Sequence, residues 1–519
     1  MSEKNKFPYM EEEKWDAEKA LEKRMEIYRS TEERIEHKKP IAQRTQATVR
    51  RTRQPSKKKK RANIKGWLIL GSICVAIIVI FIGFISLLVS LFSSDDNEIE
   101  AVQATITEMV TETESEIEEV DAATFLERAE RLAASYDYDA AIAALQEYGE
   151  DWQTQDVLSQ AFDRYTALRG ELLRWEDTTT IPHIFVRAVI VDPVRAFDGD
   201  GNEEIYNQNM ITVNELRTIL QKLYDDGFVL INMHDMVKNT ATDGESTEFE
   251  QGDIYLPEGK KPIVISQEDV NYYSYRVDGP DDDELPDAEG DGFACQLLLD
   301  DSGNLTCKYI DADGNILYGA YDFVPIVEEF VQEHPDFSYR GAKGMIAVTG
   351  MEGVFGFRTH PDWEDVLGED AYLQEIRQAQ AVAQKLKDNG WEIASQGYSK
   401  IFFADSSADV IKENLRKWKN QVEPIVGKTD ILVYPYGSDI GGAGNYSGEK
   451  FKVLTNEGYK LFCGMDSSQY WVQLQSNYMR QGRRPIDGYR MEYGAKRLSD
   501  LFDVNEVFDE DRPRPVPSV

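Results

Sequence analysis

Two adjacent carboxylates, Glu268 and Asp269, follow a short apolar run in the segment Lys261-Pro-Ile-Val-Ile-Ser-Gln-Glu-Asp269. The run from Ile263 to Ile265 is β-branched and bounded, which predicts a buried strand rather than a helix. In α/β sheets and barrels, catalytic and binding groups collect at the carboxyl ends of the strands. The pair is therefore a candidate for chemistry, although its position alone is equally typical of a solvated acidic loop.

The charge of the chain is large and unevenly spread. The 519 residues carry a net charge of −37, yet residues 1–65 hold 20 Lys and Arg against 11 Asp and Glu. The rest of the chain is strongly acidic and would repel nucleic acid, so we exclude DNA and RNA as partners. The four cysteines form no CxxC or Cys/His cluster, which argues against a structural zinc site.

Residues 67–92 form 26 consecutive residues without a charge, enough for a transmembrane helix. The alternative, a buried core helix, is disfavoured by this length and by the flanking charges. Because ten Lys and Arg lie between Arg44 and Lys65, the positive-inside rule places residues 1–66 in the cytoplasm and the remainder outside a plasma membrane. We expect the basic cytoplasmic tail to contact anionic membrane lipid.

The extracellular part divides by composition into four segments. Residues 93–121 are an acidic spacer, and 122–176 have the apolar spacing of a helical hairpin that is similar to one tetratricopeptide unit. Residues 177–500 alternate strands with helices, which predicts a parallel sheet or an α/β barrel, and 501–519 form a tail. We expect strands at 184–191, 228–231, 263–265, 344–349, 391–394, 431–434 and 459–462, and helices at 212–224, 324–334, 373–389, 408–422 and 450–457.

An insertion at 274–321 contains two hairpin signals, around Asp301-Ser-Gly-Asn304 and Asp311-Ala-Asp-Gly-Asn315. Cys295 and Cys307 fall on opposite arms of the first hairpin at nearly matching register. Outside the cell they would form a disulfide or remain two free thiols, and the sequence leaves both alternatives open.

Five segments, taken in order, resemble the polysaccharide deacetylase (NodB-homology, carbohydrate esterase 4) family. They are Lys261-Pro-Ile-Val-Ile-Ser-Gln-Glu-Asp269, Glu329-Phe-Val-Gln-Glu-His-Pro-Asp-Phe337, Gly344-Met-Ile-Ala-Val-Thr-Gly350, Leu386-Lys-Asp-Asn-Gly-Trp-Glu-Ile-Ala-Ser395 and Tyr434-Pro-Tyr-Gly437. The resemblance covers about residues 180–490. It implies a distorted (β/α) barrel of the polysaccharide deacetylase type, preceded by the transmembrane helix and the helical-hairpin stalk.

The resemblance also implies a site. In that family a divalent metal, commonly zinc, is held by an aspartate and two histidines, and a second aspartate is the general base for hydrolysis of an acetamide or acetyl ester. The metal aspartate falls on Asp269, the base on Glu268, and the two histidines on Gln396 and Lys400. The backbone N–H of Tyr436 would line the oxyanion hole.

The chain departs from the family at the metal positions. Glutamine is a poor zinc ligand, and a lysine ammonium has no lone pair to give. We therefore expect no metal cofactor, or zinc only if the site still functions. Our hypothesis is that the Lys400 ammonium lies where the ion would be and neutralises Glu268 and Asp269, since unpaired buried charge is costly. The alternative is that Lys400 points to solvent.

Three functions remain open. The first is a membrane-anchored, catalytically impaired deacetylase-like protein that binds cell-envelope glycan, peptidoglycan or another N-acetylated polysaccharide. Its candidate sugar contacts are Tyr436, Tyr272, Tyr273 and Trp471. The second is an active hydrolase of C–N or acetyl ester bonds that recruits other histidines, although no two of these share ligand spacing: His183, His234 and His360. The third is a non-catalytic envelope scaffold or signalling protein.

Overall fold

The computed structural model describes residues 122–199, 201–242, 246–277, 286–466, 468 and 470–518. The predicted cytoplasmic tail, transmembrane helix and acidic spacer (1–66, 67–92 and 93–121) lie outside the described residues and stay predictions. Among the described helices, none is both long enough and apolar enough to span a membrane. Residues 126–519 belong to one compact unit.

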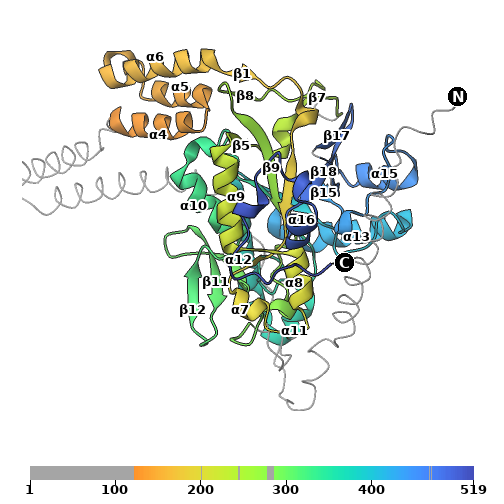
Figure 1. Ribbon diagram of the computed structural model, residues 1–519. Helices are drawn as coiled ribbons and strands as arrows, with labels where there is room; N and C mark the ends of the chain where they lie inside the picture. Colours follow the sequence, from red (N-terminus) through yellow and green to blue (C-terminus); the bar gives the residue numbers. More distant parts are fainter. Residues whose placement is uncertain are drawn as a thin grey trace, which may run out of the picture. The chain divides into compact units, whose positions relative to one another are not determined.

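In the described part of the chain, seven parallel strands close into a barrel (Figure 1). The order around the ring is β13, β14, β15, β16, β18, β2 and β9, and β9 pairs back to β13. This confirms the predicted α/β barrel. The strands are β2 His183–Val186, β9 Lys261–Gln267, β13 Gly344–Val348, β14 Trp391–Ser395, β15 Ile431–Val433, β16 Leu461–Met465 and β18 Tyr478–Pro485.

Two further strands extend the ring. β5 (Phe228–Leu230) pairs with β9 in parallel, and β17 (Trp471–Gln475) pairs with β18 antiparallel. Neither β17 nor β18 was among the predicted strands. β18 contains three arginines in Arg480-Gln-Gly-Arg-Arg484. Its sequence therefore has no continuous apolar run that would predict a strand.

Side chains alternate between the inside and the outside of the barrel. On β9, Val264 joins the inner cluster, while Ile263 and Ile265 join the outer one. Because both faces are buried, strands such as β9, β13 and β15 contain continuous apolar runs in the sequence, whereas β18 does not. The inner layer contains Val264, Met345, Ala347, Ala394, Ile431, Val433, Leu461, Cys463 and Met479.

Helices pack on the outer face (Figure 1). Thr212 and Glu215 form the capping box that begins α9, which confirms the helix predicted at 212–224. The Trp418 indole N–H donates to the carbonyl of Val348 at 3.1 Å and fixes α13 against β13. The main helices are α9 Val213–Asp225, α10 Phe323–Glu333, α12 Glu369–Asp388, α13 Ala408–Gln421 and α15 Gly448–Asn456.

The segment before the barrel contains three helices where the sequence predicted a two-helix hairpin: α4 Ala122–Ala134, α5 Tyr138–Gln146 and α6 Asp156–Glu171. The third has only three buried residues, so its apolar periodicity is weak. The Tyr136 hydroxyl donates to the carbonyl of Asp336 at 2.8 Å. β1 (Leu173–Arg174) then pairs with β8 (Tyr255–Leu256).

The predicted hairpins of the insertion are present as a three-stranded antiparallel sheet, β10 Gln296–Leu299, β11 Leu305–Ile310 and β12 Ile316–Gly319. At the two turns, the carboxylates of Asp300 and Asp311 accept backbone N–H groups two and four residues ahead. Cys295 and Cys307 are buried free thiols, so the structure has no disulfide between them.

The predicted C-terminal tail packs onto the domain. The Arg512 guanidinium is buried and donates to both carboxylate oxygens of Glu215, at 2.7 and 2.6 Å.

The smaller elements are β3 Val189–Ile190, α7 Pro193–Ala196, α8 Glu203–Asn209, β4 Ile211–Thr212, β6 Val237–Asn239, β7 Phe249–Gln251, α11 Glu364–Leu367, α14 Glu423–Val426 and α16 Gly488–Tyr493.

Candidate functional site

The candidate site lies at the carboxyl edge of the barrel. Glu268 and Asp269 follow the end of β9, and Gln396 and Lys400 follow the end of β14, with β13 between the two strands. The backbone N–H of Asp269 donates to Gln396 Oε1 at 3.2 Å, and Lys400 Nζ donates to Asp269 Oδ2 at 2.8 Å. The structure therefore brings Asp269, Gln396 and Lys400 together, and Lys400 does not point to solvent.

The Asp269–Lys400 ion pair is largely buried, with side-chain exposures of 9% and 11%. Burial by itself would raise the pKa of Asp269, but the Lys400 ammonium, with smaller contributions from Arg276 and Arg187, holds that pKa below its usual range. Asp269 is thus an ionised carboxylate with a cation supplied by the chain itself. Removing Lys400 would leave Asp269 buried with only the weaker attraction of Arg276 and Arg187, which is destabilising.

Glu268 has a different partner. Its carboxylate accepts a hydrogen bond from Arg483 on β18, and Arg483 is fully buried. Our hypothesis that Lys400 neutralises both carboxylates therefore needs correction. Glu268 continues the inward-facing alternation of Val264 and Ser266 on β9, whereas Asp269 leaves the strand with φ +59°.

Arg483 was not among the predicted site residues, because the sequence of β18 has no apolar run that identifies it as a strand. Two residues on the same strand share a face when they are two apart, so Gln481 and Arg483 point inward together. The inner layer below confirms this arrangement, because Gln481 Oε1 contacts His183 Nδ1 at 3.1 Å.

The three histidines considered as replacement ligands lie in three different places. His183 is inside the barrel, where burial and then the charge of Arg483 lower its pKa well below the usual value. His234 lies between Glu392 and Asp430, near the amino ends of β14 and β15. His360 Nε2 contacts the Tyr398 hydroxyl at 2.7 Å. In the described residues they assemble no common ligand set.

We call the carboxyl edge of the barrel around Glu268, Asp269, Gln396 and Lys400 the mouth. A metal ion does not fit the donor groups at the mouth. Gln396 Oε1 already accepts the Asp269 N–H, and the Lys400 ammonium has no lone pair. Across the described residues, no group of three His, Cys, Asp or Glu side chains is placed to hold a metal ion. The residues at the predicted metal positions thus provide a cation of their own instead of ligands.

Tyr436 joins the ion pair to a neighbouring cavity of 530 Å³. Its ring stacks on Phe402 with centroids 4.6 Å apart, and Lys400 Nζ lies 5.1 Å from its centroid. Trp471 lies in the same cavity wall, with the Arg480 guanidinium 4.5 Å from its ring centroid. Of the four predicted sugar contacts, Tyr436 and Trp471 line this cavity. The cavity is also lined by Ala404, Asp405, Gly437, Ser438, Asp439, Gly441, Gly442, Ala443, Gly464, Met465, Asp466, Gln481 and Gly482.

The other two predicted sugar contacts belong to the packed wall. Tyr272 and Tyr273 are only 5% and 3% exposed. The Tyr272 hydroxyl contacts Cys307 Sγ at 3.5 Å, and the Tyr273 hydroxyl contacts Thr349 Oγ1 at 2.9 Å. The prediction that these two rings stack on sugar therefore needs correction, because their faces are covered by protein.

Backbone strain is concentrated at this edge of the barrel. Of the seven non-glycine residues with positive φ in the described part, five lie in the loops that follow β9, β13 and β15. Each such conformation costs about 1–3 kcal/mol and persists where the surroundings enforce it, commonly at functional sites. The five are Asp269, Tyr272, Glu352, Phe355 and Tyr436.

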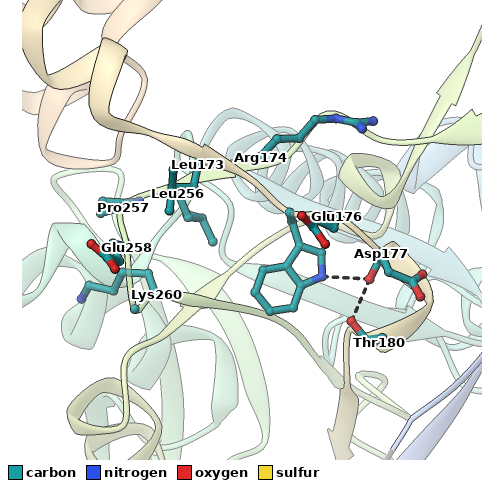
Figure 2. Close-up of a pocket in the computed structure, with 11 residues that line it drawn as sticks. Leu173, Arg174, Glu176, Asp177, Thr180, Leu256, Pro257, Glu258 and Lys260 are labelled. Atoms are coloured by element: carbon teal, nitrogen blue, oxygen red, sulfur yellow. Dashed lines mark hydrogen bonds between the residues drawn. The ribbon is translucent and has the colours of Figure 1, made fainter.

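A second cavity, of 410 Å³, lies where the segment after β1 meets the turn between β8 and β9 (Figure 2). Trp175 forms part of its wall, and its indole N–H donates to the Asp177 carbonyl at 2.9 Å. The same carbonyl accepts the Thr180 hydroxyl at 2.7 Å. This cavity lies near the amino end of β9 and shares no lining residue with the mouth.

Comparisons with known proteins give a distant likeness. No family model matches the sequence, and no curated protein matches it. Among solved structures, the Streptococcus pyogenes deacetylase PplD in complex with acetate has a TM-score of 0.30 at 14% identity, covering 61% of this chain and 94% of that chain. A de-N-acetylase from Aggregatibacter actinomycetemcomitans has a TM-score of 0.33 at 11% identity, covering 62% and 99%. At these values the likeness establishes neither a family nor an activity.

Fold and site together define an α/β protein with a closed seven-stranded parallel barrel and an ion-paired mouth. Its structural resemblance to polysaccharide deacetylases is distant.

Proposed function

We propose that this chain is a polysaccharide deacetylase-like protein that binds cell-envelope carbohydrate at the barrel mouth, with weak or no deacetylase activity. The observation that carries the proposal is the 2.8 Å bond from Lys400 Nζ to Asp269, at the position where the sequence motifs imply a metal ion. A lysine ammonium balances the charge of the aspartate, but it cannot generate the nucleophilic water that a metal ion supplies in hydrolases.

The second carboxylate is also poorly suited to catalysis. Glu268 is 5% exposed and accepts a hydrogen bond from the buried Arg483. A general base must reach the proton that it abstracts and must be free to accept it. The Arg483 guanidinium is already hydrogen-bonded to this carboxylate. Glu268 is therefore better suited to being a neutralised residue beneath a binding site than to acting as a general base.

The cavity beside the ion pair supports carbohydrate as the ligand class. Small-molecule sites combine aromatic surface with a few polar groups that fix orientation, within about 300–1,000 Å³. The 530 Å³ cavity has this character, with Trp471 and Tyr436 beside Asp405, Asp439 and Asp466. The carboxyl edge of a parallel barrel is also where α/β barrels place their sites.

The remaining parts of the proposal concern the setting. We propose that residues 67–92 span the plasma membrane, that the basic tail lies against anionic lipid on the cytoplasmic side, and that the barrel faces the cell envelope. The glycan would then be peptidoglycan or another N-acetylated envelope polysaccharide.

The test uses the full-length protein purified in detergent. Metal content is measured after purification without chelator, and acetate release is measured on acetylated chitooligosaccharide and on peptidoglycan, with and without added zinc. We expect less than about 0.1 zinc per chain and no more acetate release than in buffer without protein. We also expect the protein to bind soluble envelope glycan. One zinc per chain that disappears in Asp269→Ala, together with acetate release, would overturn the proposal.

A further inference from the structure

The outer strand of the insertion exposes apolar side chains. β12 is the last strand of the sheet β10-β11-β12 and pairs only with β11 in the described part of the chain (Figure 1). Its first three residues are Ile316, Leu317 and Tyr318, and their exposed fractions are 53%, 37% and 59%. Because successive side chains of a strand point to opposite faces, both faces of β12 present apolar surface to solvent.

The other two strands attach this sheet to the barrel. β10 and β11 contact α12, and β11 also contacts α10. Leu297 on β10 and Cys307 on β11 belong to the large core cluster, whereas no residue of β12 belongs to a core cluster formed by the described residues. The exposed side chains of β12 therefore contribute little to holding the sheet on the domain.

Two other sheet edges are covered by protein, whereas the edge of β12 is open. At β5, the backbone N–H of Tyr339 donates to the carbonyl of Leu230 at 2.9 Å. At the opposite edge of the insertion sheet, the N–H of Leu297 donates to the carbonyl of Phe355 at 2.9 Å. Alternate N–H and C=O groups of an edge strand point away from its partner, and the described residues supply no strand to pair with those of β12.

An open edge with apolar side chains favours a polypeptide as the ligand. Proteins usually protect such an edge with a charge, a proline or a covering segment, and Ile316-Leu-Tyr-Gly319 contains neither charge nor proline. An extended peptide can add to the sheet as a fourth strand, because its main chain pairs with the open edge. Its side chains would then extend the apolar surface on both faces of β12.

The turns at the two ends of the sheet are acidic. Hydrogen bonds from Asn304 hold the pKa of Asp300 below its usual range, and hydrogen bonds from Asn315 do the same for Asp311. Lys308 is the one cation in residues 296–319, all of which are described. The turn carboxylates are Asp300 and Asp301 between β10 and β11, and Asp311 and Asp313 between β11 and β12. The edge of β12 is therefore flanked by negative charge at both ends, which attracts a partner with basic ends.

A second copy of this chain fits the edge less well. Antiparallel pairing of two β12 strands would bring the turn at 311–315 of each copy to the end of the sheet at which the other copy has its turn at 300–304. Like charges brought together in this way are destabilising. The charge pattern therefore favours a different protein as the partner.

We propose that β12 binds an extended polypeptide segment of another protein by strand addition. The segment has an apolar or β-branched centre and Lys or Arg residues at its ends. Its main chain pairs with the open edge, its centre covers Ile316, Leu317 and Tyr318, and its basic ends lie near the acidic turns. The inference involves no residue of the mouth and does not depend on the proposed glycan binding.

The experiment uses the full-length protein in detergent and two matched nine-residue peptides, each blocked at both ends and labelled with fluorescein. The first is Lys-Lys-Val-Thr-Val-Thr-Val-Lys-Lys, and in the second all four lysines are replaced by glutamate. Because strand addition draws its affinity from the main chain, these generic sequences suffice. We expect the lysine peptide to bind about tenfold or more tightly than the glutamate peptide at low salt, and this difference to fall to about threefold or less in about 0.5 M sodium chloride.

Hydrogen exchange and three variants locate the peptide. The lysine peptide should slow amide exchange in residues 315–319 by about tenfold or more, because strand addition pairs outward N–H groups. Ile316→Lys and Tyr318→Lys should each weaken its binding by about tenfold or more, since a charge blocks an edge. Val410→Lys on α13 is the matched control, because it makes the same change at a side chain that is 49% exposed, and it should leave the affinity unchanged. All three positions are exposed, so each variant should unfold at the temperature of the parent protein.

Several results would overturn the inference, and none of them bears on glycan binding at the mouth. One is that neither peptide binds, or that the glutamate peptide binds as tightly as the lysine peptide. Another is that Val410→Lys weakens binding as much as Tyr318→Lys, or that exchange at residues 315–319 is unchanged, since the peptide would then be attracted to the acidic surface in general. A third is a dimer in sedimentation velocity that Tyr318→Lys dissociates, which would make a second copy the partner of β12.

Discussion

The two ends of the barrel differ in how their carboxylates are hydrogen-bonded. At the amino edge, Glu392 points into the barrel from β14, and both of its oxygens accept hydrogen bonds, from the His234 ring and from backbone N–H groups of Met233 and His234. At the carboxyl edge, Asp269 binds Lys400 through one oxygen and leaves the other without a partner.

The surroundings of the two ends differ in the same sense. The loops of the carboxyl edge contain five strained non-glycine residues, and a cavity opens beside the ion pair. A fully satisfied carboxylate is typical of a structural contact, whereas strain and unsatisfied polar atoms are typical of a functional one. The comparison indicates that His234 and its two carboxylates stabilise the barrel, and it supports the carboxyl edge as the end for the ligand proposed above.

The largest expected effect comes from Arg483→Met. This change leaves Glu268 buried without its cation, and we expect the free energy of unfolding to fall by about 3–5 kcal/mol. Urea denaturation followed by fluorescence measures the loss. Arg483→Met combined with Glu268→Gln should recover a large part of it, because the unpaired charge is removed. A loss below about 1 kcal/mol for the single variant would show that this pair does not hold the barrel together.

The second prediction concerns Lys400. We expect Lys400→Met to lower the free energy of unfolding by about 2–3 kcal/mol, less than Arg483→Met, because Arg276 and Arg187 also attract Asp269. A double-mutant cycle with Asp269→Asn should give a coupling energy of about 1–3 kcal/mol. Additive effects of the two substitutions would mean that the ion pair contributes nothing. The same Lys400→Met protein should still contain no stoichiometric zinc, since Gln396 remains a poor ligand.

The sequence was sufficient for much of this arrangement. Apolar, β-branched runs such as Ile263–Ile265 identify strands that are buried on both faces, and Thr212 with Glu215 identifies the start of a helix. The motif order also predicted Asp269 beside Gln396 and Lys400, and the structure brings these three residues together.

Other parts could not be derived from the sequence. β18 mixes three buried arginines with polar residues, so no apolar pattern reveals it, and the partner of Glu268 on that strand was missed. Tyr272 and Tyr273 are chemically suited to stacking on sugar, but their burial depends on packing that includes contacts with Cys307 and Thr349, which lie 35 and 76 residues further along the chain. Which residues pair is decided by register, and which rings are covered is decided by tertiary contacts.

The third prediction uses pH to separate the two ends. Glu392 and Asp430 raise the pKa of His234 to about 10 against the opposing effect of burial, so its contribution to stability is present below about pH 6.5 and is lost as the pH rises through 10. The lowered pKa of Asp269 has the opposite consequence, because its contribution is present above the usual pKa of an aspartate and is lost as the pH falls.

Stability is therefore compared in matched variants across pH. His234→Gln should lose about 1 kcal/mol near pH 6 and nothing near pH 10.5, a modest effect because His234 is half exposed. Lys400→Met should show its largest deficit near neutral pH and a shrinking one in acid. If the free energy of unfolding of both variants followed the same pH dependence as that of the parent protein, His234 and Asp269 would not differ as predicted here.

The smallest expected effect tests which rings at the mouth face a ligand. Tyr273→Phe removes the hydroxyl contact with Thr349 and should cost about 1 kcal/mol of stability, with no change in affinity for glycan. Trp471→Ala, in the cavity wall, should instead weaken glycan binding by about tenfold or more. Titration of one soluble glycan into both variants measures the contrast, and thermal unfolding confirms that each is folded. If Tyr273→Phe impaired binding as strongly as Trp471→Ala, the ligand would reach the Tyr273 hydroxyl, and Tyr273 would belong to the binding site and not only to the packed wall.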